Sequence, residues 1–99
     1  MTNPPLSPFV EERLVLLFPP SERSEARTLL MEQCATNVPN WQSANLNRLR
    51  CAVLKLSDGD LDQLRKAIET AKIDFRDVLT AANFGGAESY KFWTPERKW

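Results

Sequence analysis

Apolar residues recur at three- and four-residue spacing along nearly the whole chain, and this periodicity limits the fold more than any other feature. In the first run, Val10, Leu14, Leu17 and Phe18 share one helical face. Alternation of apolar and polar residues, which is typical of strands, appears nowhere. We therefore expect an all-α protein, a single small bundle of about five short helices. The expected helices cover 9–18, Ser21 or Ser24 to about Thr36, and 43–56, with two more beginning at caps on Asp60 and Asp74.

Prolines and glycines divide these runs. Three prolines within residues 1–8 predict an extended leader, because proline lacks an N–H and biases the preceding residue away from the helical region. The later points of division are Pro19-Pro20, Pro39, Gly59 and Gly85-Gly86. We expect a Pro-rich leader over 1–8, a helical domain over 9–93 and an aromatic C-terminal tail over 94–99. The 43–56 helix is apolar on two faces and is expected at the centre.

The composition argues against an enzyme. Histidine is absent, which removes the commonest general base at neutral pH and the Ser/His and Cys/His nucleophile systems. Three glycines cannot form a phosphate-binding or dinucleotide-binding glycine loop. Acidic residues between Asp58 and Glu69 follow the spacing of a calcium-binding loop, but Gln63 stands where that loop needs glycine. We expect no catalytic residue, no metal and no cofactor.

The cysteines and the apolar runs indicate a cellular location. Cys34 and Cys51 lie at apolar helical positions without CxxC spacing, so buried free thiols are expected. The run 14–18 is too short for a signal sequence or a membrane span. We expect a cytoplasmic protein with no membrane contact.

The C-terminal end combines aromatic and basic side chains, namely Tyr90, Lys91, Phe92, Trp93, Arg97, Lys98 and Trp99. In one interpretation, Phe92 and Trp93 fold back over the last two helices and enlarge the core. In the other, Trp99, Arg97, Tyr90 and Lys98 anchor a protein partner, because Trp, Tyr and Arg concentrate binding energy at interfaces. Trp99 is the residue we expect its own domain to cover least.

A second candidate surface contains Trp41, Arg48, Arg50 and Lys55 on the 43–56 helix and just before it. Arginines beside an aromatic can hold RNA or an acidic partner. One such partner is the aspartate-rich turn 58–62 of another copy of the chain. The same pattern is also typical of an ordinary solvated helix face. Nucleic acid is the less favoured ligand, because 13 basic and 13 acidic residues give a formal net charge of zero.

The string LKLSDGDLDQLRKAIETAKIDFRDVLTAANF, which begins at Leu54, followed by Tyr90 and Trp93, resembles a pattern in small bacterial helical proteins to which no function is attached. The resemblance covers about two fifths of the chain. It implies a bacterial origin and a helical hairpin closed by a third helix and an aromatic tail, and it implies no activity or ligand.

Together these features predict a non-enzymatic module that binds another protein, with self-association as a further form of the same activity. A small nucleic-acid-binding regulator that uses Trp41, Arg48, Arg50 and Lys55 is one alternative. A helical small-molecule binder or enzyme, with its site in a cleft between helices, is another.

Overall fold

The computed structural model describes residues 6–33, 43–84 and 89–99, and this part of the chain is helical without any strand. The all-α prediction is therefore confirmed. The elements are α1 (Pro8–Leu17), α2 (Pro20–Thr28), a π-helical turn η1 (Leu29–Gln33), α3 (Ser43–Ser57), α4 (Leu61–Ala81) and a 3-10 turn η2 (Ser89–Phe92). None of the described helices is both long enough and apolar enough to cross a membrane.

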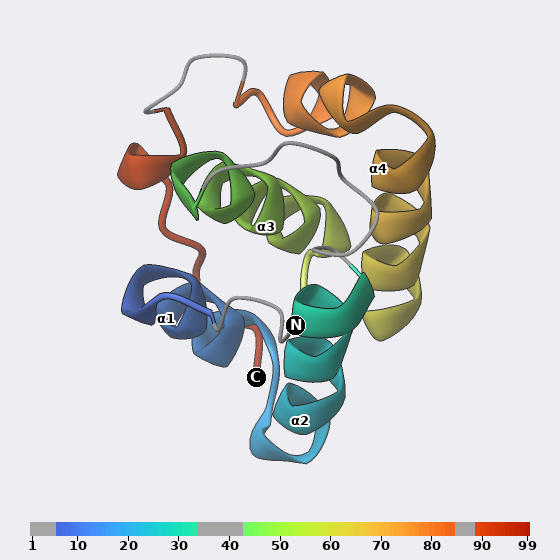
Figure 1. The fold of residues 1–99 in the computed structure, drawn as a ribbon. Coiled ribbons are helices and arrows are strands. Elements are labelled where there is room, and N and C mark those ends of the chain that lie inside the picture. Colours follow the sequence, from blue (N-terminus) through green and yellow to red (C-terminus); the bar gives the residue numbers. More distant parts are fainter. Residues whose placement is uncertain (1–5, 34–42, 85–88) are drawn as a thin grey trace.

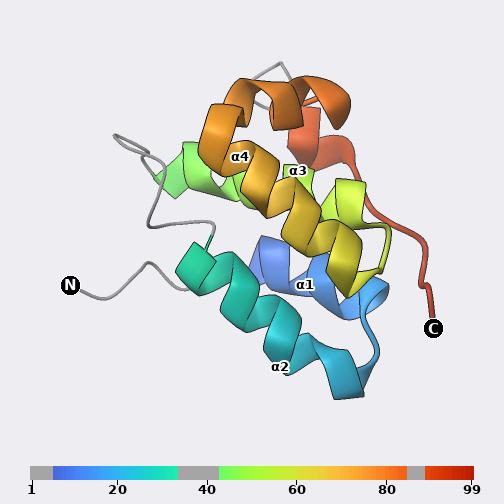
Figure 2. The ribbon, with the colours of Figure 1, turned by 90° about the vertical axis from the view of Figure 1, so that its right-hand side faces the viewer.

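α3 is the central helix, as its two apolar faces predict. It packs against α4 and α1, and α2 contacts both of these helices. The helices form two layers, with α2 and α4 in one and α1 and α3 in the other (Figures 1 and 2). Cys51, Ala52, Val53 and Leu54 follow one another along α3 and are all fully buried. Four consecutive residues of an α-helix point in four different directions, so this turn of α3 is covered on all sides.

α1 and α2 begin at prolines. Pro8 is the first residue of α1, and the hydroxyl of Ser7 accepts a hydrogen bond from the amide of Val10 at 3.3 Å. α2 begins at Pro20, without a side-chain cap. The predicted cap at Ser21 or Ser24 is therefore wrong, because proline already has the φ angle of a first helical turn and needs no N–H there.

α4 is bent where the sequence predicts a new helix. Asp74 has φ −153° and ψ 101°, which is not helical, and Figure 1 shows α4 changing direction toward its C-terminal end. At the start of α4 the carboxylate of Asp60 accepts a hydrogen bond from the amide of Gln63 at 3.1 Å, which confirms the predicted cap. At the bend Asp74 accepts from the amide of Arg76 at 3.0 Å. The two predicted helices thus form one bent element.

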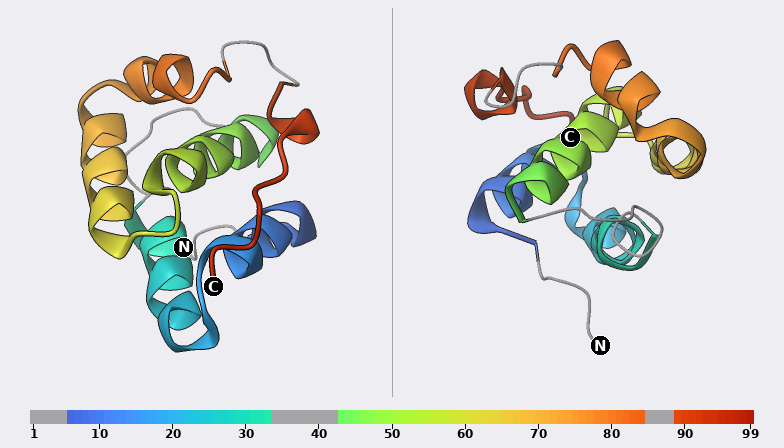
Figure 3. Two further views of the ribbon diagram at one scale, coloured as in Figure 1. Left: turned by 180° about the vertical axis from the view of Figure 1, so that it is seen from behind. Right: turned by 45° about the horizontal axis from the view of Figure 1, so that its top comes forward.

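Residues 93–99 form an extended segment that we call the C-terminal strap. From η2 the strap runs along α1 toward the connection between α1 and α2 (left view of Figure 3). The expected tail therefore lies on its own domain. Cys34, Pro39, Trp41, Gly85-Gly86 and most of the expected leader lie outside the described residues.

Candidate functional site

The C-terminal end of α1 lacks two hydrogen-bond donors. In a continuous α-helix, the carbonyls of Val15 and Leu16 would accept from the amides of residues 19 and 20. Those residues are Pro19 and Pro20, which have no N–H. The last turn of α1 therefore presents two carbonyl groups that need donors from outside the helix.

The strap supplies both donors. The amide of Lys98 donates to the carbonyl of Leu16 at 3.0 Å, and the indole Nε1 of Trp99 donates to the carbonyl of Val15 at 2.9 Å. Arg23 of α2 adds hydrogen bonds from Nε to the carbonyl of Phe18 at 3.0 Å and from Nη2 to that of Val15 at 3.4 Å. A segment more than 80 residues away in sequence thus completes the hydrogen bonding of α1.

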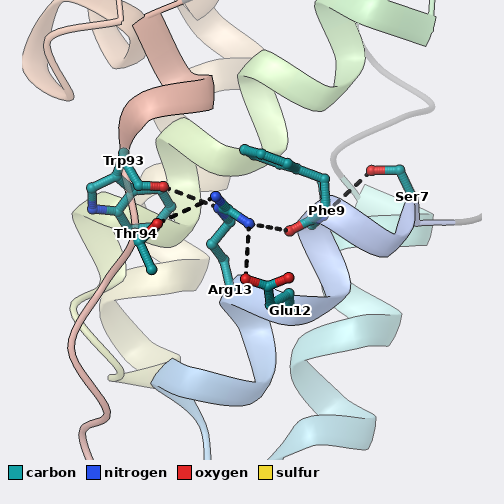
Figure 4. A network of polar contacts seen from close by, with 7 residues as sticks. Ser7, Phe9, Glu12, Arg13, Trp93 and Thr94 are labelled. Carbon is teal, nitrogen blue, oxygen red and sulfur yellow. Dashed lines mark hydrogen bonds and ion pairs between the residues drawn. The ribbon is translucent and has the colours of Figure 1, made fainter.

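Arg13 holds the other end of the strap. This side chain is only 5% exposed, and it donates from Nε to the carbonyl of Trp93 at 3.0 Å and from Nη2 to the hydroxyl of Thr94 at 3.4 Å. Its Nη1 donates to the carbonyl of Phe9 at 3.2 Å, and the guanidinium lies over the Phe9 ring (Figure 4). Glu12, 3.5 Å away, is an ion-pair partner. The buried charge therefore has hydrogen bonds on all three nitrogens, as burial of a charge requires.

The turn between α3 and α4 supports the strap from a second side. Gly59 has φ +84°, and a Cβ atom at this position would lie 2.8 Å from the carbonyl oxygen of Leu17 and 3.3 Å from the Cβ of Lys98. Asp58 forms an ion pair with the ammonium of Lys98 at 2.9 Å. Its hydrogen bond to Asp58 raises the pKa of Lys98. α1, the turn and the strap therefore meet at one point.

Trp99 is held in place but remains partly open to solvent. Besides its hydrogen bond to α1, its ring lies under two guanidinium groups, with Arg97 Cζ at 3.9 Å and Arg23 Cζ at 4.8 Å from the ring centroid. Even so, 43% of Trp99 is exposed. We call Arg23, Arg97 and Trp99 the Trp99 cluster. Trp99 is not the aromatic residue that the domain covers least, as the sequence suggests, because the open carbonyls of α1 bind it whereas Phe92 is 89% exposed.

The other aromatic residues of this end divide between core and surface. Tyr90 is buried and packs edge-on against Phe9 at a centroid distance of 5.5 Å, so it is not an exposed anchor. Trp93 is half-buried against Phe84. Phe92, which the core interpretation places inside, is 89% exposed. The core interpretation is thus right for Trp93 and wrong for Phe92.

The basic residues of α3 do not form one exposed face. Arg50 is 1% exposed on a helix that packs against α1, α4 and η2, and Arg48 is half-buried. The ammonium of Lys55 donates to the carbonyl of Ala82 at 2.8 Å and lies 4.9 Å from the centroid of Phe84. Lys55 therefore caps the end of α4. Trp41, the fourth residue of the expected face, lies outside the described residues.

The acidic residues of the 58–62 turn have structural partners. Asp58 pairs with Lys98, Asp60 caps α4, and Asp62 pairs with Arg65 at 3.0 Å. Within 6–33, 43–84 and 89–99, no group of three or more side chains could hold a metal ion. Burial raises the pKa of the Cys51 thiol to about 12, so this thiol stays protonated and unreactive at neutral pH.

A groove lies beside the strap, with a volume of about 370 Å³. Its wall consists of Leu17, Lys55, Asp58, Trp93, Thr94, Pro95, Glu96 and Lys98. Two basic and two acidic side chains line it, so it has no net charge to select an anion or a cation.

Sequence reasoning missed the residues that receive the strap, namely Arg13, Arg23 and Gly59. One signal was available for them. Two consecutive prolines at the end of a helix leave two carbonyls without intrahelical donors, which marks this end of α1 as a place where another segment or water can donate. Comparisons of the chain with protein-family models, with curated proteins and with solved structures give no match.

Proposed function

We propose that this chain is a non-enzymatic protein-binding module, and that its contact surface centres on the Trp99 cluster. The observation that carries the proposal is an indole ring fixed by one hydrogen bond and two guanidinium groups while 43% of the residue is exposed. Tryptophan and arginine dominate the binding energy of protein interfaces. A ring that is already fixed loses little conformational freedom when a partner covers it.

Arg97 is the residue of the cluster best placed to meet a partner. It is exposed, and within the described part of the chain its only interaction is the one with the Trp99 ring. Its guanidinium therefore has five N–H donors available for a carboxylate or a backbone carbonyl. Arg23, by contrast, already uses two nitrogens on α1.

The nucleic-acid alternative has less support. It needs Arg48, Arg50 and Lys55 to present a common basic surface, whereas Arg50 is buried and Lys55 caps α4. The proposal places the module in the bacterial cytoplasm, which agrees with the resemblance of residues 54–93 to small bacterial proteins.

The test compares Arg97→Glu with Lys66→Glu, which makes the same charge change at an exposed position of α4. Each protein carries an N-terminal tag and is used to capture partners from a lysate of the source organism, with circular dichroism to verify folding. We expect Arg97→Glu to reduce the recovery of at least one stoichiometric partner about tenfold or more, and Lys66→Glu to retain it. Equal recovery of every partner by both variants would contradict the proposal.

A further inference from the structure

We propose that the site on α1 and the α3–α4 turn that holds the strap is an exchangeable docking site, and that residues 95–99 of a second copy of the chain can occupy it. We call this site the strap seat and define it by the carbonyls of Val15 and Leu16, by Asp58 and by Gly59. The inference deepens the proposed function and rests on it, since it names a second copy as one partner of the module.

The strap seat is specific for its occupant. Its two carbonyls have no intrahelical donors because of Pro19 and Pro20, so a segment that leaves must be replaced by water or by other donors. The Lys98 side chain packs directly against Gly59. A Cβ atom at position 59 would lie 3.3 Å from the Cβ of Lys98, which is a tight contact. Asp58 adds a charge for the Lys98 ammonium. Together these groups recognise an extended Lys-Trp segment.

The strap is held by contacts that do not depend on its covalent connection. Two hydrogen bonds to α1 and one ion pair fix Lys98 and Trp99. Residues 96–98 are charged and exposed, so in this part of the strap only Trp99, of which 43% is exposed, buries substantial apolar surface. Exchange of a segment of this kind between identical chains is a low-cost route to a dimer, because every contact is kept in the new arrangement.

A second copy is the partner that the seat fits best. It carries the same Lys98-Trp99 pair that the seat already holds. The formal net charge of zero removes any overall repulsion between two copies. Because the attached strap competes at an effective concentration of the order of millimolar, we expect the unmodified chain to exchange only at comparable protein concentrations.

A charge reversal tests this exchange. In Lys98→Glu, the glutamate at position 98 faces Asp58 of its own chain. In Asp58→Lys, Lys98 faces a lysine at position 58. Each variant therefore places two like charges together and weakens the binding of its own strap to its own seat. Each variant also repels a second copy of itself. In a mixture of the two, both crossed pairings are attractive. The double variant Asp58→Lys with Lys98→Glu restores closure within one chain and is the matched control.

We expect each single variant and the double variant to sediment as monomers at about 0.1 mM, and the equimolar mixture to contain about tenfold more dimer. Native mass spectrometry should show that this dimer holds one chain of each kind. A mixture that sediments like its components would overturn the exchange, and so would equal dimerisation of the double variant.

A second measurement applies if a single variant does not fold. Mixing isotope-labelled and unlabelled wild-type chains at about 1 mM should give intermolecular NOEs between the Trp99 indole and α1, and their absence would overturn the exchange. The two proposals fail separately. The capture experiment with Arg97→Glu decides whether the Trp99 cluster binds proteins, whereas the charge reversal concerns only the seat beneath the strap.

Discussion

Arg13 joins two parts of the chain that lie 80 residues apart in sequence. It stands on α1, and its guanidinium reaches the backbone of Trp93 and the hydroxyl of Thr94 on the strap (Figure 4). A methionine of similar length has no donor, and a lysine carries its three N–H donors on one nitrogen, so neither reproduces the contacts of the planar guanidinium. Arg13 thus joins α1 to the strap mainly through its hydrogen bonds.

We expect Arg13→Met to lower the free energy of unfolding by about 1–3 kcal/mol, because it removes hydrogen bonds from a buried charged donor. Urea unfolding followed by tryptophan fluorescence measures this change. Arg13→Lys keeps the charge, and its free energy of unfolding should lie between those of Arg13→Met and the unmodified chain. If Arg13→Met unfolds at the urea concentration of the unmodified chain, the hydrogen bonds to the strap contribute nothing to stability.

At the level of single residues, the sequence predicts what depends on near neighbours. The cap of Asp60 on the amide of Gln63 and the break at Asp74 follow from spacing within one helical turn, and both are found. The roles of Arg13 and Arg50 could not be predicted in this way. Both arginines lie on helices, and only the packing of distant segments around α1 and α3 decides that they are buried.

The connection between α3 and α4 shows how one element depends on a single residue type. Gly59 has a positive φ, and it lies so close to Leu17 and Lys98 that a side chain would displace α1 or the strap. Asn83, after α4, also has a positive φ, of 64°. Asparagine tolerates this conformation better than most residues, and glycine adopts it freely.

We expect Gly59→Ala to lower the free energy of unfolding by about 1–3 kcal/mol, from backbone strain together with the close contact to the Leu17 carbonyl. Asn83→Gly is the matched control, because it relieves a positive φ and should leave stability unchanged or slightly higher. Chemical denaturation of both proteins measures the difference. A Gly59→Ala protein as stable as the unmodified chain would show that the turn can move away from α1.

At the level of elements, the spacing of apolar residues and the positions of prolines and glycines predict most of the helices. The expected 9–18 and 43–56 helices match α1 and α3 within one residue at each end. The predicted start of α2 is wrong because Pro20, whose φ angle already fits a first helical turn, begins the helix before Ser21. The path of the strap has no local signal at all, since its partners are on α1 and on the 58–59 turn.

For the molecule as a whole, stability should be level near neutral pH and fall on both sides. Arg27 donates two hydrogen bonds to Glu11, at 2.6 and 2.9 Å, and holds its pKa below the ordinary 4.5. The stability from Glu11 is therefore present above pH 4.5 and is lost as the pH falls through the lower pKa of the folded state.

The thiol of Cys51 makes the stability of the fold depend on pH in the alkaline range. Burial raises its pKa from 9.0 to about 12, so the unfolded chain loses this proton first. The stability that Cys51 contributes is complete below pH 9 and is lost as the pH rises toward the pKa of the folded state. With no histidine in the chain, we expect a plateau between about pH 6 and 8.

Urea unfolding at a series of pH values measures this profile. Glu11→Gln should lower stability by about 0.2–1 kcal/mol at pH 7, since the pair is partly exposed, and should reduce the acid dependence. Cys51→Ala should reduce the loss between pH 9 and 11. A profile that changes steeply between pH 6 and 8 would contradict the prediction.

The donors that complete α1 also set an order of events during synthesis. Trp99 follows Val15 by 84 residues, and at about 5–20 residues per second the ribosome needs roughly 4–17 s to add them. During this interval the carbonyl of Val15 can accept from Arg23, but the donors on Lys98 and Trp99 are absent and water must take their place. The contacts of Lys98 and Trp99 with α1 can therefore form only after α1 to α4 have been synthesised.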